Sequence, residues 1–173
     1  MSRLPSNPKP ARPDSETRAT SDDHQALRLW LRMLACGKLI EAEARSRLRA
    51  HFDTTLPRFD LMAQLERCPR GLKMGDLSKR MMVTGGNVTG ITDQLVAEGL
   101  VVRSDNPEDR RAYIVKLTPR GRREFKKMAI AHEQWIIELF GGLEDTERGQ
   151  LLGLLAKLKG HLSTIAAAGG RST

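Results

Sequence analysis

Small polar residues and glycines fill a stretch near the middle of the chain, and a pair of arginines follows it. The stretch runs from Thr84 to Asp93, and the arginines are Arg110 and Arg111. If the stretch is helical, its small side chains could reach base edges in a DNA major groove without steric clash. Glycine N–H groups at the helix start could bind a phosphate, and arginines on a protruding loop could enter a minor groove. The candidate DNA contacts are therefore Thr84, Gly85, Gly86, Asn87, Thr89, Gly90, Thr92, Arg110 and Arg111.

Positive charge is concentrated around these residues. The chain of 173 residues has a formal net charge of +8 and a pI of about 10.0. Residues 67–123 hold twelve Lys and Arg against six Asp and Glu, so most of the excess lies in one third of the chain. A basic region of this kind favours an anionic partner, with nucleic acid ahead of an acidic membrane surface.

Other kinds of chemistry lack their usual residue patterns. The four histidines are scattered along the chain. Cys36 and Cys68 form neither a CxxC motif nor a metal-ligand spacing, and Cys36 is expected to be a small buried hydrophobic residue. The glycines after Thr84 lack the Gly-Lys-Ser/Thr ending of a phosphate-binding loop. We therefore expect no enzyme activity, no metal and no cofactor.

Hydrophobic periodicity predicts the elements that would position these residues. Helices are expected over residues 22–51, 57–68, 74–81, 85–98, 119–140 and 145–165. Two short strands, 100–103 and 112–117, flank a polar loop and predict a β-hairpin. Thr84 and Thr118 are expected to cap helices, and Gly99 to end one in the left-handed conformation. This order predicts a mainly α fold with a β-hairpin wing, a winged helix-turn-helix with long N- and C-terminal helices.

The chain divides into three predicted regions. Four prolines and few large apolar residues make residues 1–21 a flexible basic arm. Residues 57–118 would be the DNA-binding lobe, and residues 22–56 and 119–168 a helical dimerisation region. An apolar stripe over residues 151–165 favours a homodimer seam, although such a stripe also fits an intramolecular core. Because the arm has no apolar signal-peptide centre and no apolar run is long enough to span a membrane, we expect a cytoplasmic protein without membrane contact.

Several segments of the lobe match one known pattern. They are Leu77–Met81, Asn87–Leu95, Glu98–Val101, Asp105–Arg111 and Val115–Gly121. Together they resemble the MarR (multiple antibiotic resistance regulator) family of bacterial transcription factors. The resemblance implies a homodimer whose two recognition helices enter successive major grooves of a pseudo-palindromic operator. It also implies that Arg111 is the wing arginine, that Asp109 positions it, and that the protein is a repressor released by a small aromatic or phenolic acid or its coenzyme A thioester.

An effector of this kind would need an apolar pocket with a polar anchor, and the first two helices carry suitable residues. The candidates are Trp30, Met33, Phe52, Arg58, Phe59 and Met62. Met and aromatic residues at helical spacing also fit a plain hydrophobic core. A winged helix can also bind proteins without reading an operator, so a protein-binding adaptor is the alternative function. Binding to a pool of DNA sequences would separate the regulator from the adaptor.

Overall fold

The computed structural model describes residues 24–81, 85–106 and 109–169, with the backbone alone for residues 106, 109–112 and 169. The predicted arm, residues 1–21, and the predicted cap Thr84 lie outside the described residues. The division of the chain into an arm, a lobe and a dimerisation region stays a prediction.

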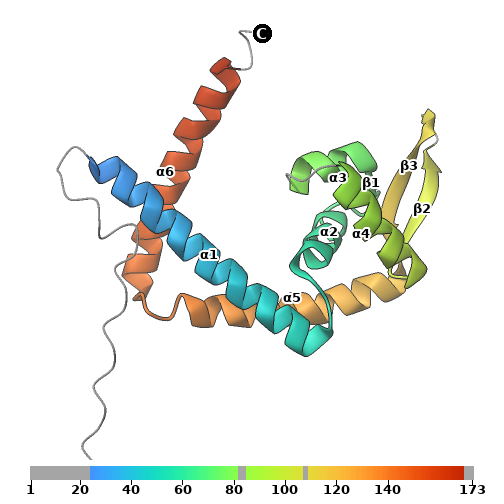
Figure 1. The fold of residues 1–173 in the computed structure, drawn as a ribbon, viewed down its shortest axis with the longest axis horizontal. Helices are drawn as coiled ribbons and strands as arrows, with labels where there is room; N and C mark the ends of the chain where they lie inside the picture. The colour runs from blue at the N-terminus through green and yellow to red at the C-terminus, as the bar shows by residue number, and fades with distance from the viewer. Residues whose placement is uncertain (1–23, 82–84, 107–108, 170–173) are drawn as a thin grey trace, which may run out of the picture.

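Three long helices form one part of the molecule (Figure 1). They are α1 (Gln25–Phe52), α5 (Pro119–Leu139) and α6 (Asp145–Gly169). The other part is a lobe in which three shorter helices pack beside a small sheet. Its helices are α2 (Leu56–Glu66), α3 (Met74–Met81) and α4 (Gly85–Ala97). In Figure 1, α5 runs from the sheet toward the region where α1 and α6 cross, so it joins the two parts. This arrangement confirms the predicted mainly α winged helix-turn-helix.

The sheet has three antiparallel strands in the order β1-β3-β2. Its strands are β1 (Leu72–Lys73), β2 (Val101–Asn106) and β3 (Asp109–Leu117). The predicted hairpin is present, but its strands extend into the residues expected to be loop, with a register shift between Asp105 and Asn106. We did not predict β1, because two residues are too short to show alternation. Gly71 brings β1 to β3 with a φ of 89°, and a Cβ there would lie 2.7 Å from the Val115 carbonyl oxygen. Only glycine fits this approach.

The start of α5 is fixed to the start of the hairpin. Thr118 caps the helix as predicted, because its Oγ1 accepts a hydrogen bond from the Gly121 N–H at 2.9 Å. The same hydroxyl donates to the Gly99 carbonyl oxygen at 2.8 Å. Gly99 has a φ of 69°, the left-handed conformation expected at the end of α4. A Cβ on Gly121 would lie 1.9 Å from the Leu100 carbonyl oxygen, so the two backbones touch.

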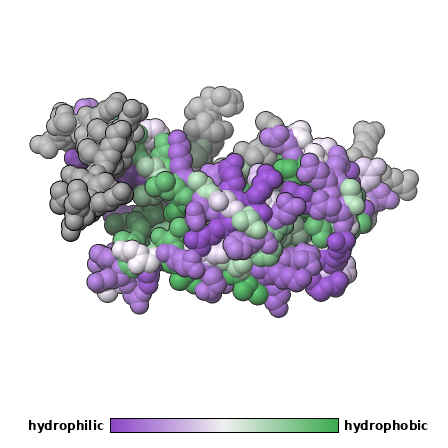
Figure 2. Space-filling model, turned by 60° about the horizontal axis from the view of Figure 1, so that its bottom comes forward, coloured by the Kyte–Doolittle hydropathy of each residue, from purple (hydrophilic) through white to green (hydrophobic). Residues whose placement is uncertain are grey.

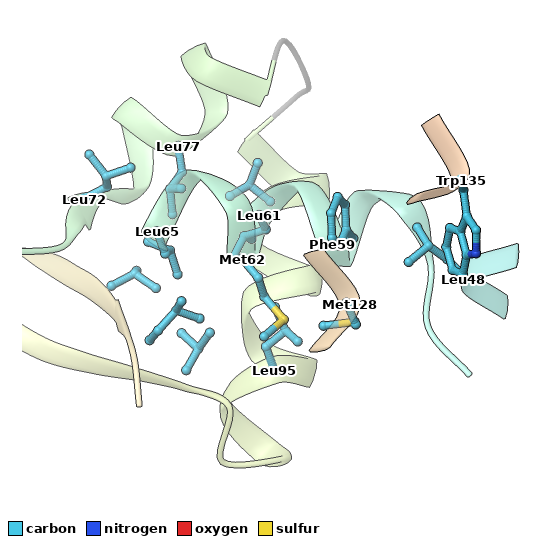
Figure 3. Close-up of a cluster of buried hydrophobic side chains, with 14 residues drawn as sticks. Leu48, Phe59, Leu61, Met62, Leu65, Leu72, Leu77, Leu95, Met128 and Trp135 are labelled. Carbon is cyan, nitrogen blue, oxygen red and sulfur yellow. The ribbon is translucent and has the colours of Figure 1, made fainter. Parts of the chain in front are cut away.

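The hydrophobic core lies in the lobe and at its junction with α1 and α5 (Figure 3). Its most deeply buried large side chains come from every helix of the lobe and both long strands. They are Leu61, Met62, Leu65, Leu77, Val88, Leu95, Val101 and Val115, with Leu48 from α1. Figure 3 shows Trp135 of α5 beside Leu48, at the end of the cluster away from Leu72. The lobe therefore holds a core of its own, and α5 is packed onto it.

Helix α6 buries none of its residues in the described chain. Leu152 is 72% exposed and Leu154 is 67% exposed, although the apolar stripe continues along the whole helix. Figure 2 shows apolar residues gathered on the side of the molecule where α1 and α6 lie. None of the described helices combines the length and the apolar character needed to cross a lipid bilayer.

Candidate nucleic-acid interface

Helix α4 presents two chemically different faces. Val88, Thr92 and Leu95 are fully buried and pack the helix against the rest of the lobe. The other face carries the exposed residues Gly85, Gly86, Asn87, Thr89 and Gly90. These five are candidate DNA contacts from the sequence, and the structure brings them together on the first two turns of one helix. An exposed helix face of small polar residues and glycines can approach base edges closely.

Thr92 was wrongly included in this set. Its side chain is fully buried, and its Oγ1 donates a hydrogen bond to the Val88 carbonyl oxygen at 2.7 Å. Because Thr92 lies four residues after Val88 and three before Leu95, it belongs to the packed face. Its hydroxyl is satisfied within the helix, which removes the usual cost of burying a polar group. Thr92 is therefore unavailable to contact DNA in this conformation.

Ion pairs fix α4 to its neighbours. Asp93 pairs with Arg103 of β2, which ties the helix to the hairpin. Glu98, directly after α4, pairs with Arg58 of α2, and its carbonyl oxygen accepts a hydrogen bond from Arg120 at 3.0 Å. The helix is thus held to the hairpin, to α2 and to α5. We did not predict these links, because residues ten or forty positions apart carry no periodic signal in the sequence.

The hairpin carries the second group of candidate contacts. Asp109, Arg110 and Arg111 lie at the start of β3, where Asp109 pairs with Asn106 of β2. Their side chains lie outside the described residues, so the roles given to Arg110, Arg111 and Asp109 stay predictions. Tyr113, two residues further along β3, is 55% exposed.

Positive charge also borders α4 on the side of α3. Lys79 and Arg80 occupy the last turn of α3 and are exposed. Arg80 donates a hydrogen bond to the sulfur of Cys68 at 3.2 Å. Figure 2 shows a mainly hydrophilic surface on the side of the lobe. Cations beside an exposed polar helix are suited to the phosphates on either side of a groove.

The six candidate effector residues do not form one site. Phe52, Arg58 and Met62 border a common cleft of about 390 Å³ between the end of α1, α2 and α5. Phe59 is instead packed in the core, with its ring centroid 4.8 Å from His132. Trp30 and Met33 lie near the start of α1 and are exposed, 57% and 39% respectively. Within one protomer the six are therefore separated, because helical spacing gives the face of a helix but not which partner covers it. Their role in effector binding stays a prediction.

A second cleft of about 480 Å³ lies between α1, the start of α2 and α4. Arg45, Arg49 and Arg58 line it from the first two helices, and Asn87, Ile91 and Gln94 line it from α4. We call it the arginine cleft. From the sequence, Arg45 and Arg58 could meet a carboxylate or phosphate, and Arg58 was a candidate effector residue. Arg49 was not indicated, since charged residues on a long helix usually face solvent.

The terminal helices form a shallow apolar groove. Met33 of α1 faces Leu155, Leu158 and Leu162 of α6 around a space of about 470 Å³. Leu162 is 54% exposed and Leu155 is 38% exposed. Cys36 is exposed on α1, so the expectation of a buried small residue was wrong. In the described part of the chain, His, Cys, Asp and Glu side chains do not gather in threes that could hold a metal ion.

Comparisons with known proteins place this geometry in a family. The MarR family model matches residues 54–113, which contain α2, α3, α4 and the first part of the hairpin. A MarR family transcriptional regulator from Silicibacter pomeroyi has a similar crystal structure, with 34% identity and a TM-score of 0.68. The match covers 84% of this chain and 99% of that one. The chain belongs to the MarR family.

Two further proteins are similar to this chain, one of them solved with DNA. A mutant MarR from E. coli, crystallised with operator DNA, is 25% identical with a TM-score of 0.68, over 80% of this chain and 99% of that one. The HTH-type transcriptional regulator YkoM of Bacillus subtilis is 34% identical over 89 residues, 51% of this chain. That match spans 58% of the length of YkoM. The resemblance read from the lobe residues is confirmed.

Proposed function

We propose that this MarR family chain is a DNA-binding transcriptional regulator that acts as a homodimer. The observation that carries the proposal is the exposed face of α4, where small polar residues and glycines stand beside a hairpin and basic side chains. Asn87 offers an amide that can hydrogen-bond to adenine, and Gly90 lets the backbone approach a base closely. Arg110 and Arg111 are proposed to enter the adjoining minor groove, with Asp109 positioning Arg111.

The terminal helices support the dimer. Leu152, Leu154 and Leu162 of α6 remain more than half exposed in one protomer, which costs free energy in water. A second copy would cover this surface and place two copies of α4 side by side. Two-fold symmetry then predicts a pseudo-palindromic operator with half-sites about 10 bp apart. We propose that the chain occupies such an operator in the absence of effector and acts there as a repressor.

Release from the operator is proposed to follow the binding of a small aromatic or phenolic acid, or of its coenzyme A thioester. The support lies in two clefts that border both the long helices and the lobe, one of them lined by three arginines. A coupling of about 1–3 kcal/mol between effector and operator would be enough for such a response.

Selection from a pool of random duplex DNA tests the regulator function. At moderate salt, the full chain should enrich a two-fold repeat, and log affinity should fall with log salt by about 0.9 per neutralised phosphate. Asn87→Ala should weaken binding to the enriched site. Gln134→Ala, an exposed amide on α5, is the matched control and should leave it unchanged. Absence of any enriched sequence would refute the regulator and favour a protein-binding adaptor.

A further inference from the structure

The end of α1 packs against the second half of α5, and we call this contact the joint. Trp135 of α5 lies at its centre, with its ring centroid 5.5 Å from that of His51 and 6.1 Å from that of Phe52. Leu48 is fully buried beside the same ring (Figure 3). The lobe lies at the other end of α5, so the joint sets the angle between α1 and the helix that carries the lobe (Figure 1).

Arg47 connects the two helices across the joint. Its Nε donates a hydrogen bond to Glu43 of the same helix at 2.7 Å, and its Nη1 donates to Glu138 of α5 at 2.5 Å. Its guanidinium carbon lies 6.0 Å from the centroid of the Trp135 ring, which is the range of a cation–π contact. One side chain therefore binds both helices and lies over the aromatic centre of the joint.

These contacts are more specific than those of an ordinary surface ion pair. The Arg47 side chain is 26% exposed, and Glu43, four residues earlier on α1, holds its guanidinium in one orientation. Arginine has a planar fork that can bind two carboxylates and also lie over an aromatic ring, which lysine lacks. The pair Arg103–Asp93, by contrast, joins two elements within the lobe. Arg47 is thus suited to hold α1 and α5 at one angle.

We propose that Arg47 is a positioning residue that fixes the angle between α1 and α5, and thereby the operator spacing that the dimer accepts. Glu138 is about 28 Å along α5 from Pro119, where the lobe is attached, so a small change of angle is amplified at the lobe. One base pair inserted between the half-sites moves one of them by about 3.4 Å and rotates it by about 35°. A dimer could follow that change only by straining the Arg47 contacts. The effect on spacing rests on the proposed function, whereas the effect on the angle needs only the dimer.

The separation of the two lobes in the absence of DNA tests the angle. A spin label on Val102→Cys, an exposed position of β2, reports this distance by double electron–electron resonance when Cys36 and Cys68 are changed to serine. We expect a narrow distance distribution for the chain with Arg47. In Arg47→Met, which keeps the apolar stem but loses the guanidinium, the distribution should broaden by about 3 Å, the displacement that a tilt of about 5° produces along α5.

Two further variants show whether the ion pair itself is responsible. Glu138→Gln keeps the size of the side chain but removes its charge, so it should broaden the distribution as Arg47→Met does. Lys127→Met removes an ion pair with Glu124 that lies within α5, and it is the matched control that should leave the distribution unchanged.

Operator binding tests the spacing. Fluorescence anisotropy gives the dissociation constant for the enriched operator and for the same operator with one base pair inserted at its centre, and their ratio is the spacing penalty. In Arg47→Met the penalty should be about threefold to fivefold smaller than in the original chain, because the contacts that the longer operator would strain are already absent. The double variant with Glu138→Gln should match Arg47→Met, because both substitutions remove the same interaction.

The ratio separates positioning from a general loss of stability, which would weaken binding to both operators equally and leave the penalty unchanged. An unchanged penalty in Arg47→Met would therefore overturn the control of spacing. A distance distribution as narrow as that of the original chain, or equal broadening in Lys127→Met, would overturn the positioning role. If the distribution broadens as expected while the DNA pool yields no enriched sequence, the regulator function fails and the positioning role stands.

Discussion

Leu162→Ala should weaken the homodimer without unfolding the lobe. Leu162 is 54% exposed in one protomer and lies in the apolar groove with Met33. The substitution removes three carbon atoms, each worth about 0.8 kcal/mol when fully buried. If a partner covers the exposed half, association loses about 1.3 kcal/mol per copy and about 2.5 kcal/mol for the symmetric pair. That corresponds to a roughly 70-fold increase in the dissociation constant.

Fluorescence-detected sedimentation over nanomolar to micromolar concentrations measures this change directly. Val102→Ala is the matched control, since Val102 is 44% exposed but lies on β2 in the lobe. It should leave the dissociation constant unchanged. An unaltered dimer in Leu162→Ala, or equal weakening in both variants, would refute the assignment of α6 to the dimer interface. A monomer at micromolar concentration in the original chain would refute the dimer itself.

Three further changes test other parts of the structure. Arg111→Ala should weaken operator binding in a fluorescence-anisotropy titration while sedimentation still shows a dimer; unchanged affinity would remove the wing from recognition. Thr118→Ala should cost about 2 kcal/mol of unfolding free energy in a urea titration, because the cap on Gly121 and a second hydrogen bond are lost; Thr118→Ser should recover most of it. Burial lowers the pKa of His132 while Asp60 opposes that effect, and burial raises the pKa of Asp60. Since folding disfavours protonated His132, stability should fall as pH drops below about 6.5. The melting temperature of His132→Gln should therefore drop less between pH 7.5 and 5.5 than that of the original chain. The raised pKa of Asp60 has the opposite effect on stability, but only at lower pH, where this carboxylate takes up its proton.

The parts of the fold that depend on local sequence could be predicted. Thr118 followed by proline marks the start of α5, and Gly99 marks the end of α4, because each residue type satisfies a specific need of a helix end. The hairpin follows from alternation along β3. Most of the exposed face of α4 also follows from periodicity, once Val88 and Leu95 define the buried side.

The incorrect or missing predictions concern features that depend on packing between segments far apart in the sequence. Thr92 has the polarity of a surface residue, but its position on the helix places it against the core. There the Val88 carbonyl oxygen accepts a hydrogen bond from its hydroxyl. Strand β1 is created by its pairing with β3 rather than by any preference of Leu72 and Lys73. The arginine cleft needs side chains from three helices, so its composition becomes visible only when those helices are placed together.

In the proposed regulator, the connection between the two parts of the molecule would let small changes control DNA binding. Helix α5 has 21 residues and is about 31 Å long, and it carries the lobe at one end. At its other end, Trp135 packs beside Phe52 and His51 of α1. A tilt of about 5° at that joint would move the far end of a helix of this length by roughly 3 Å. In the proposed homodimer, two copies of α4 would have to match major grooves about 34 Å apart, so a displacement of this size would be enough to misplace them. Under the proposed function, a residue of the joint would therefore govern operator affinity without contacting DNA.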